Sequence, residues 1–449
     1  MPIYAEQLMA LVEENDPWAF GPDEIGDVQI AAANERFAEK RQQIRVLDRR
    51  ATDEGKDTIK GLSDLVPLLF AHTTYKSYPE AFTREGRWDR MTKWLGTVCA
   101  GDFSDVQLEG IGNADQWVDR MRDAGHMIVT SSGTTGYVSY LHMSPRDLKF
   151  KQRNERATLD WVTGSHPADL ATFYCSAAKG YTNAVLQAQL ANREFARPGS
   201  IFHLTSQVIS LGELNRQAEL RRRVIDGTID PADLATEASK STQRQALAAR
   251  EFEAFVSELI DHRSQPLILC GPYIQVFSVI EAARSRGIKD GDFVDVILRI
   301  GGGLKGSKLP ADFRDQIATF FGAGPDRWSE GYGMGEILLV CPKCRSGRFH
   351  VSPWVIPLVL DKSGERLVER DGRIIEGRAA FFDTASTGRW GGIITGDKVK
   401  IDLEPCPCGR PSPSILEVQR YSELEGDDKI TCSATFDTYV RGLTSEDGD

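Results

Sequence analysis

The stretch "TSSGTTGYVS" occupies residues 130–139 and directly follows the short apolar run "HMIVT". Glycines let a backbone approach anionic oxygens, and small hydroxyl side chains add hydrogen-bond donors without bulk. The stretch therefore has the composition of a phosphate-binding loop. It is not the P-loop of nucleotide triphosphatases, because Tyr137 stands where that loop has lysine. An ordinary flexible loop has a similar composition, so the choice between the two depends on motifs elsewhere in the chain.

Apolar runs alternate with helical patterns on both sides of the middle of the chain. The runs at 169–177 and 265–273 are bounded by turn residues, and an amphipathic pattern follows each of them. Short strands that alternate with helices predict an α/β enzyme with stacked parallel or mixed sheets. Residues 212–261 are charged and helical in pattern, which predicts a helical hairpin laid over the core.

The sequence texture divides the chain into three consecutive segments. Residues 1–125 predict the helical start of a large domain, and residues 126–395 predict its core, which the family resemblance described below implies binds nucleotide and an acyl group. Residues 396–449 predict a short β-rich segment. The four aromatic residues Tyr174, Tyr181, Tyr273 and Phe277 either line an acyl pocket or belong to the plain core.

Composition excludes several function classes. The 449 residues carry a net charge of -11, which disfavours nucleic acid as the partner. No apolar run reaches the roughly 20 residues that span a bilayer, so no membrane span is expected. The first residues lack a basic segment followed by an apolar one, so they do not form a signal peptide, and a cytoplasmic protein is expected.

Three further motifs favour a nucleotide-binding enzyme. They are a glycine cluster "RIGGGLKG" (299–306), the stretch "SEGYGMGEI" (329–337) and the turn "ITGDKVKI" (394–401). Glutamate supplies the hard oxygen ligand that Mg²⁺ prefers, and an aspartate accepts hydrogen bonds from both ribose hydroxyls. A tyrosine ring offers a flat face to adenine. These roles fall to Glu336, Asp397 and Tyr332, respectively.

In this order and spacing, the four motifs resemble the adenylate-forming superfamily, which includes acyl- and aryl-CoA ligases and luciferases. The resemblance covers about residues 125–432. It implies a large α/β domain with stacked sheets, ATP and Mg²⁺ as cofactors, and a carboxylic acid as substrate. The nucleotide-binding residues that it implies are Ser131, Ser132, Gly133, Thr134, Thr135, Gly136, Gly302, Gly303, Tyr332, Gly333, Met334, Asp397 and Arg420.

Two pairs of cysteines predict a metal site. Cys341 and Cys344 form "CPKC", and Cys406 and Cys408 belong to "EPCPCGRP". Four thiolates suit tetrahedral Zn²⁺, and the spacing in a reducing compartment favours metal over disulfides. We therefore expect a structural zinc held by these four cysteines. His350 could replace one thiolate, but we expect it to be an ordinary polar residue near the start of a strand.

The C-terminal region departs from the superfamily pattern. Only 52 residues follow Asp397, where most members carry a mobile domain of roughly a hundred residues with a catalytic lysine, so a truncated mobile domain is expected. In this the chain resembles the acyl-protein synthetase of bacterial bioluminescence. That resemblance implies that Cys432, in "ITCSATF", receives the acyl group as a thioester. The alternative is that Cys432 is a small apolar residue in a strand.

The motifs together predict a ligase that activates a carboxylic acid as its adenylate and passes the acyl group to a thiol of a protein or of a partner. Catalytic roles are expected for Glu336, Thr134, Lys305 and Cys432, and Lys305 or Lys308 supplies a cation for the triphosphate. An aryl- or acyl-CoA ligase, an amide-forming ligase and a non-catalytic nucleotide-binding subunit stay open as alternatives.

Overall fold

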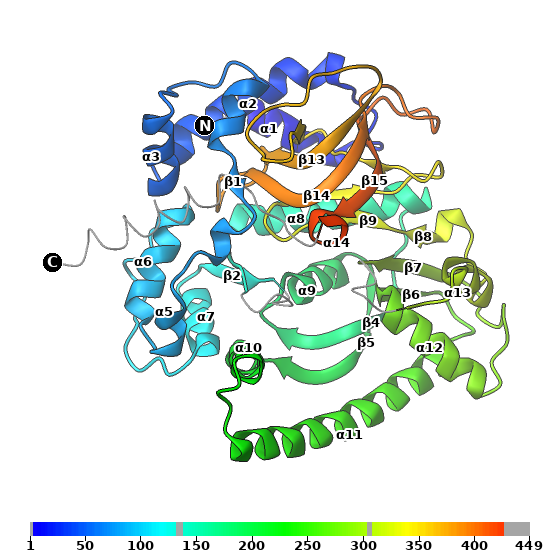
Figure 1. Cartoon of the computed structure of the whole chain (residues 1–449). Coiled ribbons are helices and arrows are strands. Elements are labelled where there is room, and N and C mark those ends of the chain that lie inside the picture. Colours follow the sequence, from blue (N-terminus) through cyan, green and yellow to red (C-terminus); the bar gives the residue numbers. More distant parts are fainter. Residues whose placement is uncertain (1–2, 132–137, 303–307, 426–449) are drawn as a thin grey trace. The chain divides into compact units, whose positions relative to one another are not determined.

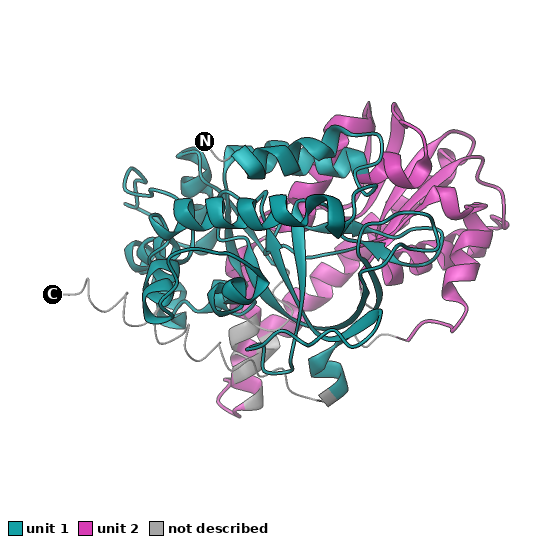
Figure 2. Ribbon diagram, turned by 90° about the horizontal axis from the view of Figure 1, so that it is seen from above, with its two compact units in different colours: residues 1–132, 138–157, 332–449 teal, residues 133–137, 158–331 magenta. Residues whose placement is uncertain are grey.

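The computed structural model describes residues 3–131, 138–302 and 308–425 of the chain (Figure 1). These residues form two compact units that interleave along the sequence (Figure 2). The first unit comprises the described residues up to 157 and from 332 onward, and the second comprises 158–331. The three consecutive segments expected from the sequence stay a prediction. Local patterns do not signal that the chain leaves the first unit at residue 158 and returns to it at residue 332.

The second unit is built on a five-stranded parallel sheet with the strand order β5-β4-β6-β7-β8. Its strands are β4 (Leu170–Gly180), β5 (Ala196–Ile209), β6 (Leu267–Pro272), β7 (Val296–Gly301) and β8 (Trp328–Ser329). Its helices are α9 (Asn183–Phe195), α10 (Leu211–Ile225), α11 (Pro231–Asp261), α12 (Tyr273–Ser285), α13 (Phe313–Phe321) and the 3₁₀ turn η4 (Pro325–Arg327). The strands and helices expected from the alternating patterns are confirmed.

Helices cover both faces of this sheet, because successive side chains of a strand point to opposite faces. Phe173, Leu269 and Leu298 pack on one face in a core cluster with residues of α11, α12 and α13. On the other face Ile268 and Ile297 pack with residues of α9. Both faces of the central strands are therefore buried, which explains why their sequences read as continuous apolar runs.

The two helices α10 and α11 confirm the helical prediction for 212–261 but only part of its packing. The last turns of α11 bury Phe255, Val256 and Leu259 against the sheet. By contrast, nearly every residue of α11 from 236 to 250 is exposed. The described middle of α11 is therefore not laid over the core, because it has too few apolar residues to cover a sheet.

The first unit is built on a six-stranded, mainly antiparallel sheet with the path β11-β15-β14-β13-β12. Its strands are β11 (Phe349–His350), β12 (Val355–Leu360), β13 (Ile374–Asp383), β14 (Gly392–Asp402) and β15 (Ser414–Arg420). The short strand β1 (Phe70–Ala71) adds to β14 in parallel, with Phe70 opposite Ile393. β14 and β15 form a long antiparallel pair in which Asp397 lies opposite Arg420.

Helices and two small hairpins complete the first unit. The helices are α1 (Ile3–Ala10), α2 (Pro22–Arg41), α3 (Arg45–Asp53), α4 (Leu62–Leu65), α5 (Glu80–Arg84), α6 (Trp88–Val98), α7 (Ala114–Asp123), α8 (Pro145–Thr163), which begins in this unit, and α14 (Tyr421–Glu425), with the 3₁₀ turns η1 (Leu11–Glu13), η2 (Val66–Leu68) and η3 (Thr74–Lys76). Buried tryptophans join helices to the sheet: Trp390 contacts Phe37 of α2 and Phe382 of β13. Among the described helices, none has the length and apolarity needed to cross a bilayer.

Candidate nucleotide and metal sites

The loop that opened the sequence analysis joins two strands of a hairpin, β2 (Met127–Thr130) and β3 (Tyr140–Met143). The ends of the loop are tied to each other. The Ser139 amide donates to the Ser131 hydroxyl at 2.9 Å, and the Ser131 amide donates to the Ser139 carbonyl at 3.2 Å. Residues 132–137, which include the expected phosphate-binding residues Ser132, Gly133, Thr134, Thr135 and Gly136, lie outside the described residues.

Glu336 lies beside the base of this hairpin. The Ser139 hydroxyl donates to Glu336 Oε1 at 3.3 Å. The fully buried Arg389 holds two backbone segments here. It donates to the carbonyl of Glu336 at 3.1 Å and to the carbonyl of His142, in β3, at 2.6 Å. The structure thus brings together a serine at the end of the loop and the carboxylate expected to hold magnesium.

Tyr332, Asp397 and Arg420 form a second group in the first unit. The Tyr332 hydroxyl donates to Asp397 Oδ2 at 2.8 Å, and Arg420 Nε lies 3.8 Å from Asp397 Oδ1. Burial of the ring, together with the neighbouring Asp397 carboxylate, raises the pKa of Tyr332 well above its usual value, so the hydroxyl remains a donor. The three residues come from β9 (Gly331–Gly333), β14 and the end of β15, and the sequence analysis expected each of them at a nucleotide.

The segment between Tyr332 and Glu336 is held by a two-stranded sheet of β9 (Gly331–Gly333) and β10 (Val340–Pro342). A Cβ on Gly333 would lie 2.4 Å from the Leu339 carbonyl oxygen, so only glycine fits there. Met334, the next residue, is partly buried. Glycine at this position thus allows the close return of the chain that places Tyr332 and Glu336 in one short loop.

The remaining predicted residues are less informative. Gly302 follows β7 in the second unit, whereas Gly303 and Lys305 lie outside the described residues, as does Cys432. Lys308 is exposed. The sheet of the second unit separates the aromatic residues expected at an acyl pocket, since Tyr273 and Phe277 pack on one face and Tyr174 on the other. These three residues therefore do not line one common pocket.

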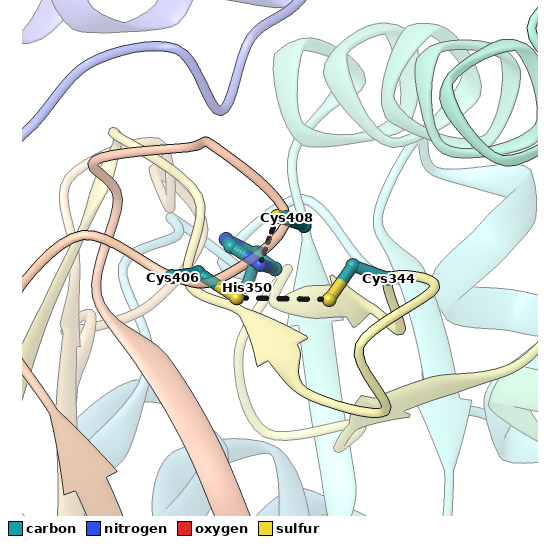
Figure 3. A group of neighbouring side chains, drawn as sticks. All are labelled: Cys344, His350, Cys406 and Cys408. Atoms are coloured by element: carbon teal, nitrogen blue, oxygen red, sulfur yellow. Dashed lines mark hydrogen bonds between the residues drawn. The ribbon is translucent and has the colours of Figure 1, made fainter.

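A group of metal-ligand side chains lies at the far end of the β14–β15 pair. Cys344, His350, Cys406 and Cys408 are all buried, and their ligand atoms lie within 4.8 Å of one another (Figure 3). Three of the four predicted thiols are thus confirmed as neighbours. The fourth was wrong: Cys341 is not part of the group, and His350 takes its place. Cys341 instead lies buried in β10, near Tyr332.

The spacing of the ligand atoms matches tetrahedral zinc. Zn–S bonds of about 2.3 Å and Zn–N bonds of about 2.0 Å place two sulfurs about 3.8 Å apart and a sulfur and a nitrogen about 3.5 Å apart. Cys344 Sγ and Cys406 Sγ are 3.8 Å apart, and Cys408 Sγ lies 3.4 Å from His350 Nε2. The donor set, two knuckle sulfurs with a third sulfur and an imidazole, therefore fits a structural zinc ion.

Two turns of the same construction present the sulfurs. The Cys344 amide donates to the Arg348 carbonyl, and the Cys406 amide donates to the Arg410 carbonyl, each at 2.8 Å. In both turns the glycine three residues after the cysteine donates back to the cysteine carbonyl. These glycines, Gly347 and Gly409, have φ values of 77° and 97°, which side-chain-bearing residues rarely adopt.

His350 is prepared to act as a neutral ligand. Burial, helped by the charges of Arg410 and Arg348, lowers the pKa of His350 to about 4, so its imidazole is neutral at pH 7. The Ser412 hydroxyl lies 2.8 Å from Nδ1, and with the proton on Nδ1 the Nε2 lone pair points to the sulfurs. The sequence signal for this site was the repeated pattern "CRSGR" (344–348) and "CPCGR" (406–410), followed closely by a histidine and a serine.

Comparisons with known proteins bear on the fold. No protein-family model matches the chain, and no curated protein matches it in sequence. Among solved structures it is similar to an open conformation of a 2-hydroxyisobutyryl-CoA ligase in complex with 2-HIB-AMP and CoA. The two share 13% sequence identity and a TM-score of 0.58, over 90% of this chain and 77% of that one.

Other matches are shorter. MatB from Rhodopseudomonas palustris with ATP bound shares 16% identity over 64% of this chain and 47% of that chain, with a TM-score of 0.38. A long-chain-fatty-acid-CoA ligase from Archaeoglobus fulgidus shares 11% identity over 67% and 52%, also with a TM-score of 0.38. The narrower likeness to the acyl-protein synthetase of bacterial bioluminescence finds no support among these structures. The expected fold is confirmed: the chain has the fold of the adenylate-forming enzymes.

Proposed function

We propose that the protein joins a carboxylic acid to ATP, forming an acyl-adenylate and pyrophosphate, and then transfers the acyl group to a thiol. The observation that carries the proposal is the group Tyr332, Asp397 and Arg420, with Glu336 at the base of the β2–β3 hairpin nearby in the chain. Each of these side chains has the chemistry that a nucleotide and its counter-ion need, and the fold is that of enzymes with this reaction.

In this proposal Asp397 accepts hydrogen bonds from the ribose hydroxyls, and Tyr332 fixes the orientation of the carboxylate while its ring faces the adenine. Arg420, opposite Asp397 across the strand pair, contributes positive charge at the same edge. The reaction joins two anions, so catalysis is mainly the offsetting of charge and the alignment of the acid with the α-phosphorus. No protein base is required, because a carboxylate is already a nucleophile.

Glu336 would hold magnesium together with phosphate oxygens. Its carboxylate is a hard oxygen ligand, and Ser139 and Arg389 fix the carboxylate and its backbone, respectively. A bound magnesium ion would supply charge neutralisation to the triphosphate. Thr134 and the other hydroxyl residues of the loop, and Lys305, are proposed as further phosphate ligands, on the sequence pattern alone.

The proposed structural zinc has no part in the chemistry. The four ligands Cys344, His350, Cys406 and Cys408 leave no coordination position for water or substrate. Zinc there would tie the loop between β10 and β11 to the connection between β14 and β15. Since β14 carries Asp397 and β15 ends at Arg420, the metal would hold the base of the strand pair that presents both residues.

The acceptor is proposed to be a thiol, either of coenzyme A or of Cys432. The ligase at a TM-score of 0.58 was solved in complex with 2-HIB-AMP and CoA, which supports a CoA thiol. The "ITCSATF" pattern supports Cys432. An amide-forming ligase would accept an amine and tolerate Cys432→Ala. A non-catalytic nucleotide-binding subunit would bind ATP and exchange no pyrophosphate.

The proposal is tested by acid-dependent exchange of labelled pyrophosphate into ATP, with fatty, aromatic, hydroxy and amino acids. Wild-type protein should support exchange with one class of acid, and Glu336→Gln should lower the rate by at least about 100-fold. Glu365→Gln, an exposed glutamate in the same unit, is the matched control and should leave the rate unchanged. ATP binding without exchange for any acid would refute the ligase proposal and favour the binding subunit.

A further inference from the structure

Lys76 lies in the turn that follows strand β1, and β1 pairs with β14, the strand that contains Asp397. Strand β1 runs parallel to β14, and the His72 amide donates to the Ile394 carbonyl at 2.9 Å. Because the two strands run in the same direction, the chain after β1 continues the way β14 runs beyond Ile394. β14 continues to Asp397, and the chain after β1 turns into η3, which ends at Lys76.

Neighbouring side chains fix this turn. The Tyr78 hydroxyl donates to the Val138 carbonyl at 3.1 Å, which joins the turn to the chain that leaves the hairpin loop. The Tyr75 hydroxyl donates to the Trp390 carbonyl at 3.4 Å, and Trp94 Nε1 donates to the Ser77 hydroxyl at 3.2 Å. The position of Lys76 is therefore set by three hydrogen bonds of its neighbours and by the β1–β14 pair.

Two charged groups of the proposed site lie close enough to Lys76 to act on its pKa. They are the Glu336 carboxylate and the Arg420 guanidinium. Burial lowers the pKa of Lys76, Glu336 opposes this by stabilising the charged form, and Arg420 adds to the lowering. Lys76 is partly buried and forms no ion pair within 4 Å among the described residues.

Two other cations near Glu336 and Asp397 are already engaged. Arg389 is fully buried and donates to the carbonyls of Glu336, His142 and Gly335, so it holds backbone. Arg420 lies opposite Asp397 and is largely exposed, with its side chain 68% accessible. Lys76 is a further cation in this part of the described chain, partly buried and close enough to Glu336 for the carboxylate to act on its pKa.

We propose that Lys76 is a catalytic residue whose ammonium contacts the reacting anions and stabilises the charge that develops as the acid attacks ATP. This inference rests on the proposed adenylation. The sequence motifs suggested only Lys305 or Lys308, in and after the glycine cluster, as the cation for the triphosphate. The inference adds a lysine from a turn in the first unit. Lys76, Glu336 and Arg420 all belong to the first unit, so the role needs no other part of the chain.

The step that Lys76 assists is balanced without any proton transfer. One oxygen of the acid carboxylate forms a bond to the α-phosphorus, and the bond from this phosphorus to the bridging oxygen of the β-phosphate breaks. Pyrophosphate leaves with that electron pair. Negative charge is concentrated on the α-phosphoryl oxygens and the leaving oxygen in the transition state, and a fixed ammonium in a partly buried position lowers its energy.

The test compares Lys76→Met, Lys76→Gln and Lys76→Arg with wild type in acid-dependent ATP–pyrophosphate exchange at saturating magnesium. Lys93→Met, an exposed lysine of α6, is the matched control. Thermal unfolding is measured first for each variant, and the Gln variant replaces Met if the latter is not folded. Lys76→Met should lower kcat by about 100-fold and change the KM for ATP by less than about 3-fold. Lys76→Arg should recover at least about 10-fold of the loss, and Lys93→Met should match wild type.

Two results would overturn the inference, and they differ from failure of the proposed function. If folded Lys76→Met keeps a kcat within about 3-fold of wild type, Lys76 merely balances the charge of Glu336. If the loss lies entirely in the KM for ATP, Lys76 binds ground-state phosphate and does not act in the transition state. If wild type itself exchanges with no acid, the proposed function fails and this inference falls with it.

Discussion

The Tyr332 hydroxyl donates a 2.8 Å hydrogen bond to Asp397 Oδ2, across 65 residues of sequence. The bond joins β9 to the middle of β14. It leaves the other carboxylate oxygen of Asp397 facing Arg420 at 3.8 Å. The hydrogen bond from Tyr332 thus fixes the orientation of Asp397. In the proposed function, this lowers the entropy that nucleotide binding would otherwise lose.

Replacing Tyr332 by phenylalanine tests this orientation. The ring stays and the donor is lost, so the free energy of unfolding should fall by about 1 kcal/mol. ATP affinity should fall by about 5- to 10-fold, because Asp397 loses its fixed direction. Calorimetric titration with ATP and urea unfolding measure the two effects. Tyr4→Phe, on an exposed tyrosine of α1, is the control. Unchanged ATP affinity in Tyr332→Phe would contradict a role in nucleotide binding.

The structure and the sequence pattern predict different fourth zinc ligands, His350 and Cys341, respectively, and mutation separates the two. Purified wild-type protein should contain about one zinc ion per chain, and Cys344→Ser, Cys406→Ser and His350→Ala should each lose most of it. Cys341→Ser should retain zinc, since Cys341 lies outside the group. Metal content by mass spectrometry decides. Zinc that depends on Cys341 and not on His350 would contradict the geometry described above.

Arg389 should be among the side chains that stabilise the first unit most. Its guanidinium is fully buried and donates to three backbone carbonyls, those of His142, Gly335 and Glu336. Arg389→Met should lower the free energy of unfolding by about 3 kcal/mol, because the carbonyls lose their donors. Arg49→Met, at an exposed position of α3, should change it by less than about 0.5 kcal/mol. Equal effects in urea unfolding would contradict the role given to Arg389.

Asp383 predicts a pH dependence of stability. Burial raises the pKa of Asp383 to about 6 from 3.8, although the amides of Leu338 and Ala385 donate to its carboxylate. A raised folded-state pKa means that the folded protein holds the proton more tightly than the unfolded chain. The stability from Asp383 is therefore full below pH 3.8 and is lost as the pH rises through about 6.

The isosteric variant Asp383→Asn isolates this contribution. The free energy of unfolding of wild type minus that of Asp383→Asn should fall by on the order of 3 kcal/mol between pH 4 and pH 6, and should then be constant. Urea unfolding at several pH values measures it. Other titrating groups, such as His142, cancel in the difference. A difference that stays constant from pH 4 to pH 7 would mean that Asp383 is not shifted upward.

The residues of the proposed nucleotide site were predictable because they belong to short motifs. Tyr332 and Glu336 share one loop, and Asp397 lies in a turn-like "TGD" within a strand-rich region. Each is flanked by glycines whose backbone freedom the loop needs, as Gly333 illustrates with the Leu339 carbonyl against it. Alternating apolar runs likewise predicted the parallel sheet, since buried strands between helices leave a clear signal.

The sequence does not show which residues far apart in the chain contact each other in the fold. The spacing of "CPKC" suggested that Cys341 and Cys344 share a metal, but the turn at Cys344 points its sulfur toward His350 and the second knuckle, while Cys341 belongs to β10. Lys76 precedes Glu336 by 260 residues, and the sequence does not show the pairing of β1 with β14 or the contact of Tyr78 with Val138 that together position the turn of Lys76. Likewise, the helical pattern of residues 212–261 does not show which part of α11 packs against the sheet.

The central claim is that the acid attacks the α-phosphorus of ATP. It is tested most directly with an acid whose carboxylate carries ¹⁸O, in the presence of ATP, magnesium and hydroxylamine as acceptor. When the acceptor attacks the acyl carbon, the bond between this carbon and the bridging oxygen breaks, so one labelled oxygen stays on AMP. The account predicts AMP with one ¹⁸O by mass spectrometry, together with the hydroxamate of the acid. Unlabelled AMP, or ADP as the product, would contradict it.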